Sequence, residues 1–137
     1  MNALKKLALF IWQLPQMLLG YLLLFLVYTP KYVVEVDGVK IYFVDRMAKS
    51  INFGQMSFIT SRLYRVGCDI SELAVVRHEV GHSKQSRRLS WLYLFVITIP
   101  ALVWAARFPK KKMRSTRFYD FFTERWADRL GDVKRSK

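Results

Sequence analysis

The residues best suited to chemistry form the pentapeptide His78-Glu79-Val80-Gly81-His82. Residues four apart on an α-helix lie on one face, so His78 and His82 can present two ring nitrogens to one metal ion. Glu79 lies about 100° around the helix, where it can take a proton from a metal-bound water. Two histidines do not complete a catalytic zinc site, so a third protein ligand is expected elsewhere in the chain.

The third ligand is predicted in residues 122–128, FTERWAD, where Glu124 and Asp128 share a helix face. We expect Glu124 to bind the metal. Asp128 is expected to accept the outer N–H of a ligand histidine and so fix the ring orientation. Gln85 returns to the face of the two histidines, where it can hydrogen-bond near the site. A solvated glutamine is an equally good interpretation of that position.

The composition favours a membrane surface over nucleic acid as partner. The 137 residues fit one domain, and 53% of them are hydrophobic although the net charge is +13. Two apolar stretches with flanking lysines and arginines account for both figures, a pattern typical of proteins that meet anionic lipid headgroups. A nucleic-acid partner is not expected, because such proteins lack long apolar segments. Cys68 is the only cysteine, which disfavours a disulfide framework and a thiolate zinc site.

Residues 7–28 form an apolar run long enough to cross a bilayer, and they predict an N-terminal transmembrane helix. A cleaved signal peptide is the alternative, because Lys5 and Lys6 precede the run. The length of the run and the absence of small residues at Tyr28-Thr29-Pro30 favour a retained anchor.

Residues 31–60 predict a small antiparallel β-sheet. Two β-branched runs surround Asp37-Gly38, which is a strong hairpin signal, and a third strand is expected within residues 51–60 near Gly54. An edge strand of this sheet can hold a substrate backbone by strand addition. A sheet that merely covers the metal helix is at least as good an interpretation.

The metal helix is predicted over residues 69–88, with Asp69 and Glu72 as a capping box. Gly81 costs about 1 kcal/mol in a helix interior relative to alanine. Close approach of another element, such as the Glu124 helix, would explain a glycine there.

Residues 89–106 form the second apolar segment. A straight span of about 27 Å would separate Glu124 from the two histidines across the membrane. We therefore predict a re-entrant segment, broken near Pro100 or lying shallowly, with a full span and a metal deep in the bilayer as the alternative. Basic residues on both sides favour the cytoplasmic face for both flanks: Lys84, Arg87 and Arg88 before the segment, and Lys110, Lys111, Lys112 and Arg114 after it.

The third-ligand helix is predicted over residues 115–131, capped by Ser115 or Thr116 and ended by Gly131. A polar tail that frays is expected over residues 132–137. Aromatic residues at spacings of four are expected to pack this helix on a side separate from its carboxylates, namely Phe118, Phe122 and Trp126.

The two motifs resemble those of the gluzincin metallopeptidases, especially the branch with the CAAX prenyl proteases, the HtpX heat-shock proteases and the BlaR/MecR sensor peptidases. They are also similar to an HExGHxxQS string with a later Thr-Glu-x-x-Ala-Asp element in small bacterial proteins. The resemblance implies that His78, His82 and Glu124 bind Zn²⁺, that Glu79 is the general base, and that Asp128 supports a histidine. It covers two short windows, and the small size of this chain departs from the larger families.

The function expected from these features is that of a zinc-dependent membrane endopeptidase, with its site at or near the cytoplasmic side of a bacterial inner membrane. Its substrates would be membrane-associated peptides or proteins. The alternatives are a non-catalytic membrane protein with a structural metal and a zinc hydrolase acting on a non-peptide amide or ester. An additional oxyanion donor is expected, but spacing does not choose among Tyr119, Arg117 and Arg125.

Overall fold

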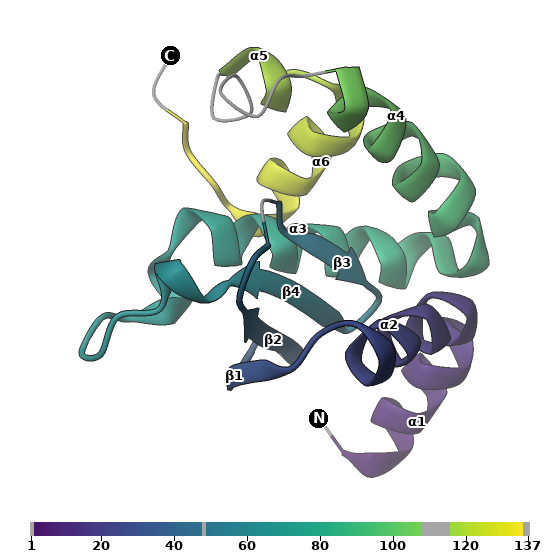
Figure 1. Cartoon of the computed structure of the whole chain (residues 1–137). Coiled ribbons are helices and arrows are strands. Elements are labelled where there is room, and N and C mark those ends of the chain that lie inside the picture. The colour runs from purple at the N-terminus through teal and green to yellow at the C-terminus, as the bar shows by residue number, and fades with distance from the viewer. Residues whose placement is uncertain (1, 48, 108–115, 136–137) are drawn as a thin grey trace.

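The computed structural model describes residues 2–47, 49–107 and 116–135. The chain is α+β, with a mixed β-sheet between the N-terminal helices and a helix from the middle of the sequence (Figure 1). The expectations for Ser115 as a cap and for the basic cluster at residues 110–114 concern positions outside the described residues.

The sheet has the order β1-β2-β4-β3, with β1 Pro30–Val36, β2 Val39–Val44, β3 Ile51–Phe53 and β4 Met56–Thr60. The hairpin at Asp37-Gly38 is confirmed, and both turn residues have positive φ, 51° and 76°, as a type I′ turn requires. The predicted all-antiparallel sheet is wrong, because β2 and β4 pair in parallel. Residues 51–60 form two strands around Gly54 instead of one, and the chain places the later strand, β4, inside the sheet.

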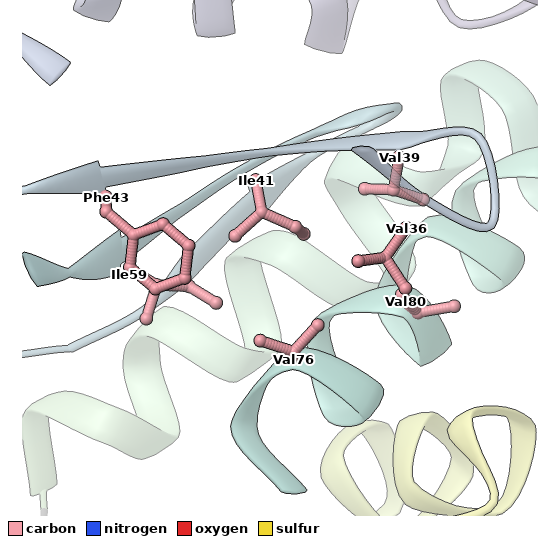
Figure 2. Packing of buried hydrophobic residues seen from close by; sticks show 7 residues of the cluster. All are labelled: Val36, Val39, Ile41, Phe43, Ile59, Val76 and Val80. Atoms are coloured by element: carbon pink, nitrogen blue, oxygen red, sulfur yellow. The ribbon is translucent and has the colours of Figure 1, made fainter. Parts of the chain in front are cut away.

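One face of the sheet packs against helix α3, Ala74–Leu89. Val76 and Val80 project from α3 towards strand residues that are almost fully buried (Figure 2). Burying one such side chain contributes about 1.5–3 kcal/mol. This layer fixes which side of α3 faces the sheet and leaves other sides for the site. The strand members of the cluster are Val36, Val39, Ile41, Phe43 and Ile59.

The opposite face is covered by the N-terminal helices α1, Ala3–Trp12, and α2, Leu14–Leu26 (Figure 1). The prediction of one continuous helix over residues 7–28 is wrong, because the two helices meet at 93°. Gln13 between them has non-helical φ and ψ, and Pro15 lies in the first turn of α2, where its missing N–H costs nothing. Among the described residues no single helix has the length and hydropathy of a membrane span. Two bent helix pairs reach that length and composition together, namely Ala3–Trp12 with Leu14–Leu26 and Ala74–Leu92 with Leu94–Arg107.

Helix α3 begins at Ala74, five residues later than predicted, and the capping box is wrong. Asp69 caps the short 3₁₀ helix Ile70–Glu72 by accepting from the N–H of Ser71. The N-cap of α3 itself is Leu73, with no side-chain hydrogen bond.

The segment after α3 bends before Pro100. A 3₁₀ turn, Ser90–Leu92, and a π-helical turn, Leu94–Thr98, lead into α4, Ile99–Arg107, and the two parts of the pair meet at 117°. The predicted break near Pro100 is therefore wrong in position. Pro100 lies in the first turn of α4, where a proline is tolerated.

The C-terminal region forms α5, Thr116–Tyr119, and α6, Phe122–Gly131, so the predicted continuous helix over residues 115–131 is wrong. Gly131 is the last helical residue, as expected, and Asp132 follows with left-handed φ and ψ. The aromatic packing side is also wrong, because Phe122 is 47% exposed. Helix α6 buries the small residues Thr123, Ala127 and Gly131 together with its carboxylates.

Candidate metal centre

Helices α3 and α6 approach each other through glycines. A Cβ on Gly81 would lie 1.9 Å from the carbonyl oxygen of Ala127, and a Cβ on Gly131 would lie 2.0 Å from that of Arg77. Any larger side chain would force the helices apart. The close approach expected from Gly81 is confirmed, and it brings the carboxylates of α6 to the histidines of α3.

Side chains of α3 hold α6 in this position by donating to its backbone. Arg77 Nε donates to the carbonyl of Gly131 at 2.9 Å, and Lys84 Nζ donates to that of Leu130 at 2.9 Å. These carbonyls at the end of α6 have no partner within the helix, and cations there also interact favourably with the helix dipole. These contacts fix both the position of α6 along its axis and its rotation about that axis.

His78, His82 and Glu124 converge on one point. His78 Nε2 lies 3.1 Å from His82 Nε2 and 3.1 Å from Glu124 Oε2, and His82 Nε2 lies 3.7 Å from that oxygen. Tetrahedral zinc with bonds of 2.0–2.1 Å separates its ligand atoms by about 3.3 Å. The three residues are at most 8% exposed. This buried His-His-Glu group could therefore hold a metal ion.

The outer nitrogen of each histidine is engaged by a side chain that sets the ring orientation. His78 Nδ1 lies 2.7 Å from Asp128 Oδ1, as expected from the sequence. His82 Nδ1 lies 2.8 Å from Gln85 Oε1, while Gln85 Nε2 donates to the Thr123 carbonyl at 2.8 Å. The second bond fixes the amide so that its oxygen accepts from His82. Both rings consequently present Nε2 to the convergence point.

Ionisation of the metal-free group follows from burial and these contacts. Burial alone would lower the pKa of His78, but the hydrogen bonds to Asp128 and Glu124 raise it from 6.5 to about 9. Burial alone would raise the pKa of Glu124, yet the hydrogen bond with His78 and the nearby His82 ring hold this pKa well below its usual range. The metal-free group thus contains an imidazolium and a carboxylate, and a cation that binds there must displace a proton.

Glu79 is the buried carboxylate that these contacts do not use. It is 2% exposed, it lines the same cavity as the His-His-Glu group, and its Oε2 has no hydrogen-bond partner among the described residues. A buried carboxylate oxygen without a donor is costly. It is therefore free to bond to a molecule that enters the cavity.

A cavity of about 900 Å³ lies over the group. Its size matches sites for small molecules or peptide segments. Most of its wall is apolar, and α2, α4, the sheet and α5 all contribute, with Leu23, Ile51, Ile59, Ile97, Ala101 and Phe118 among the lining residues.

Strand β3 is the last strand of the sheet and pairs with no further strand in the part of the chain that the structure describes. Lys40 donates to the Gln55 carbonyl, so in the parallel pairing Ser57 directs its N–H and C=O towards β2. Asn52 pairs with Ser57, and the same alternation directs the N–H and C=O of Asn52 away from β4. Asn52 also lines the cavity.

The sequence motifs did not identify Arg135 or Tyr93, which lie beside the site. They named Tyr119 as one of three candidate oxyanion donors without choosing among them. Arg135 donates to Asp128 at 2.6 and 3.0 Å, and its guanidinium lies 3.2 Å from the ring centroid of Tyr119. The expected fraying of the tail is therefore wrong as far as Arg135. Tyr93 lines the cavity although it lies in an apolar run with no motif. Arg125 is exposed on α6, and the side chain of Arg117 is outside the described residues.

Comparison with protein-family models, curated proteins and solved structures found no match to this chain.

Proposed function

We propose that this protein is a zinc-dependent membrane endopeptidase of the gluzincin type, which cleaves membrane-associated peptides or proteins near the cytoplasmic face of a bacterial inner membrane. The buried group of two histidines and a glutamate supports metal binding. The ligand set of nitrogen and oxygen atoms at tetrahedral separations suits Zn²⁺.

The observation that carries the hydrolytic proposal is the position of Glu79. A structural zinc site is normally closed by a fourth protein ligand and has no need of a base. Here the described residues supply three ligand atoms, and the unpartnered carboxylate oxygen of Glu79 lies on the cavity wall with them.

The chemistry divides between the ion and the chain. Zinc in this site would supply a Lewis acid for the scissile carbonyl and acidify a water molecule. Glu79 accepts the proton of the attacking water and then donates it to the leaving amine. Asp128 and Gln85 keep the two histidine rings in the orientation that directs Nε2 to the reaction centre.

The free edge of β3 supports a peptide substrate. A peptide in extended conformation can pair with the N–H and C=O of Asn52 as an added strand. The apolar cavity wall then receives apolar side chains. The same apolar wall also suits an amide or ester of a lipid, which remains the second candidate because it needs the same hydrolytic chemistry.

The test compares wild type with Glu79→Gln, purified in detergent. Both are expected to bind about one zinc ion by elemental analysis, and only wild type is expected to cleave a library of membrane-segment peptides. Glu72→Gln is the matched control, since it makes the same change in the 3₁₀ helix before α3.

Three results would contradict the proposal. If purified wild type binds no zinc, the assignment of the metal site is wrong. If wild type and Glu79→Gln cleave equally, Glu79 is not the general base. Cleavage of lipid amides or esters but of no peptide would assign the second candidate.

A further inference from the structure

Most of the large apolar side chains exposed in the described residues gather on the two bent helix pairs. Helix α2 exposes Leu18, Leu22 and Phe25, at 55, 53 and 88%. The segment after the second bend, through α4, exposes Phe95, Ile99 and Leu102. Spacings of three and four make each set a continuous stripe along one side of its helix. Apolar stripes of this extent on a protein surface mark an interaction site.

The two stripes adjoin. Trp12 at the end of α1 and Trp91 after α3 are 53 and 58% exposed and line one small apolar pocket. The indole N–H of Trp12 donates to the Arg87 carbonyl at 2.9 Å, which ties the two pairs together. In Figure 1 the helices α1 and α2 lie on one side of the C-terminal end of α3 and α4 lies on the other. They therefore form one surface, which we call the apolar face.

At each bend one side chain is buried in the protein. Gln13 is fully buried between α1 and α2, where its Nε2 donates to Ser86 Oγ at 2.7 Å and its Oε1 accepts from Gln55. Tyr93, at the other bend, is 2% exposed. Each bend is therefore held against the protein on its inner side.

The inner side of α2 is also held by protein. A Cβ on Gly20 would lie 3.1 Å from Phe53 Cβ, so α2 rests directly on the sheet. That sheet carries the ion pair of Lys31 and Asp45, and Glu35 of β1 pairs with Lys6 of α1. Charged groups are costly in hydrocarbon, so these pairs limit how deeply α1 and α2 can enter it.

We propose that the apolar face docks into one leaflet of an anionic bilayer, with α1, α2 and the segment from Ser90 through α4 lying along the interface and none of them crossing it. Helix α2 is about 20 Å long and α4 about 14 Å, against a hydrocarbon thickness of about 30 Å. Interfacial helices bury one side to a depth of about 5–10 Å. Tryptophans such as Trp12 and Trp91 favour the headgroup level.

The basic side chains near the apolar face favour anionic lipids. Lys5 in α1, Arg88 in the last turn of α3 and Arg107 at the end of α4 are exposed. Each basic side chain near an anionic leaflet adds attraction of about 1 kcal/mol. With a net charge of +13 for the whole chain, the protein complements an anionic surface.

This docking deepens the proposed function, on whose membrane setting it rests. Leu23 of α2 and Leu102 of α4 line the cavity from the two pairs that form the apolar face. A substrate segment lying at the interface would thus reach Glu79 along an apolar wall.

The first test is flotation of purified protein with preformed vesicles. Wild type is expected to float with phosphatidylcholine–phosphatidylglycerol vesicles and less with phosphatidylcholine alone. Phe25→Glu and Phe95→Glu are each expected to reduce partitioning at least about tenfold. Val66→Glu is the matched control, because Val66 is 95% exposed in the loop before α3, away from the apolar face, and it is expected to float like wild type. Circular dichroism verifies the fold of each variant.

The second test locates the two sides of each bend in membranes of a bacterial host. Single cysteines replace exposed residues near the two ends of the first pair, Lys5→Cys and Thr29→Cys, in a Cys68→Ser background. The same is done on the two sides of the second bend, with Arg88→Cys at the end of α3 and Arg107→Cys at the end of α4. All four are expected to react from the cytoplasmic side with an impermeant maleimide. Cysteines on the two sides of one bend that react from opposite faces of the membrane would overturn the proposal.

Two flotation outcomes would also overturn it. One is that Phe25→Glu and Phe95→Glu both partition into vesicles as strongly as wild type does. The other is that wild type does not float and forms a lipid-free dimer, measured by light scattering, which Phe25→Glu converts to monomer. That result would assign the apolar face to a second copy of the chain. Neither test uses activity, so failure of hydrolysis in the Glu79→Gln comparison is a separate result.

Discussion

Gly81 of α3 lies so near Ala127 of α6 that a Cβ on Gly81 would fall 1.9 Å from the Ala127 carbonyl oxygen. The obstacle is backbone, so it cannot rotate away as a side chain would. The metal centre depends on this contact, because Glu124 comes from α6 and the two histidines come from α3.

Gly81→Ala is therefore expected to separate the helices. Alanine improves helix propensity by about 1 kcal/mol, but overpacking costs about 1–3 kcal/mol, and more where backbone must move. We expect a net loss of unfolding free energy in denaturant titrations and weaker zinc binding. Arg88→Ala, on the exposed side of α3, is the control. Unchanged stability and zinc affinity for Gly81→Ala would show that the helices are not in contact as described.

Asp128→Asn is expected to weaken zinc binding by about 10–100-fold, the usual effect of removing a carboxylate that orients a ligand histidine. The asparagine retains the size of the side chain but loses the charge that stabilises the His78 N–H. Competition with a chelator measures the affinity. Asp132→Asn, just beyond α6, is the control for a general charge effect. An equal loss in both variants would argue that net charge, and not ring orientation, sets the affinity.

Local sequence signals predicted the hairpin and the convergent side chains. Asp37-Gly38 adopts positive φ at both positions, which few other dipeptides do as readily. His78 and His82 share a face through the helical repeat, and Asp128 reaches a histidine because it lies one turn from Glu124. These relations depend on backbone geometry within a few residues, and the sequence determines that geometry.

Long-range packing decided what the sequence did not predict. Gln13 and Gln16 interrupt an apolar run that has the composition of a membrane span, but their partners, Ser86 and Ser90, are some 70 residues away. Insertion of β4 beside β2 is likewise a tertiary event. The bend falls before Pro100 because Tyr93 is buried against the protein, which no local pattern reveals.

Zinc binding is expected to release a proton from His78 near pH 7. The pKa of His78 in the metal-free protein is raised to about 9, against the lowering effect of burial, by its hydrogen bonds to Asp128 and Glu124. Zinc binds the neutral ring, so affinity should increase from about pH 7 to about pH 9. In the metal-free protein the sign is opposite: the protonated ring stabilises the fold fully below pH 6.5, and this contribution is lost as pH rises through about 9.

Calorimetry in buffers of different ionisation enthalpy counts the released protons. Asp128→Asn is expected to release fewer protons near pH 7, because it lacks one of the two carboxylates that hold the proton on His78. Proton release that is zero in wild type, or identical in the two proteins, would contradict the assignment.

Ser86 and Ser83 offer a matched pair on α3 for testing how the N-terminal helices are held. Both are fully buried. Ser86 Oγ accepts from Gln13 Nε2 at 2.7 Å and from Gln16 Nε2 at 3.1 Å, whereas Ser83 Oγ has no partner among the described residues. Ser86→Ala leaves a buried amide of Gln13 unpaired, at a cost of about 1–3 kcal/mol. Ser83→Ala removes no hydrogen bond, so its effect should be close to zero.

The loss of stability in Ser86→Ala should be confined to α1 and α2, because Gln13 and Gln16 join these helices to α3 and not to the metal centre. We expect faster proteolysis at Thr29, between α2 and β1, with zinc affinity largely retained. Mass spectrometry of the digestion products gives the cleavage site and rate. Equal destabilisation by Ser83→Ala would mean that the hydroxyls act through packing. Loss of zinc in Ser86→Ala would mean that the N-terminal helices and the metal centre unfold as one cooperative unit.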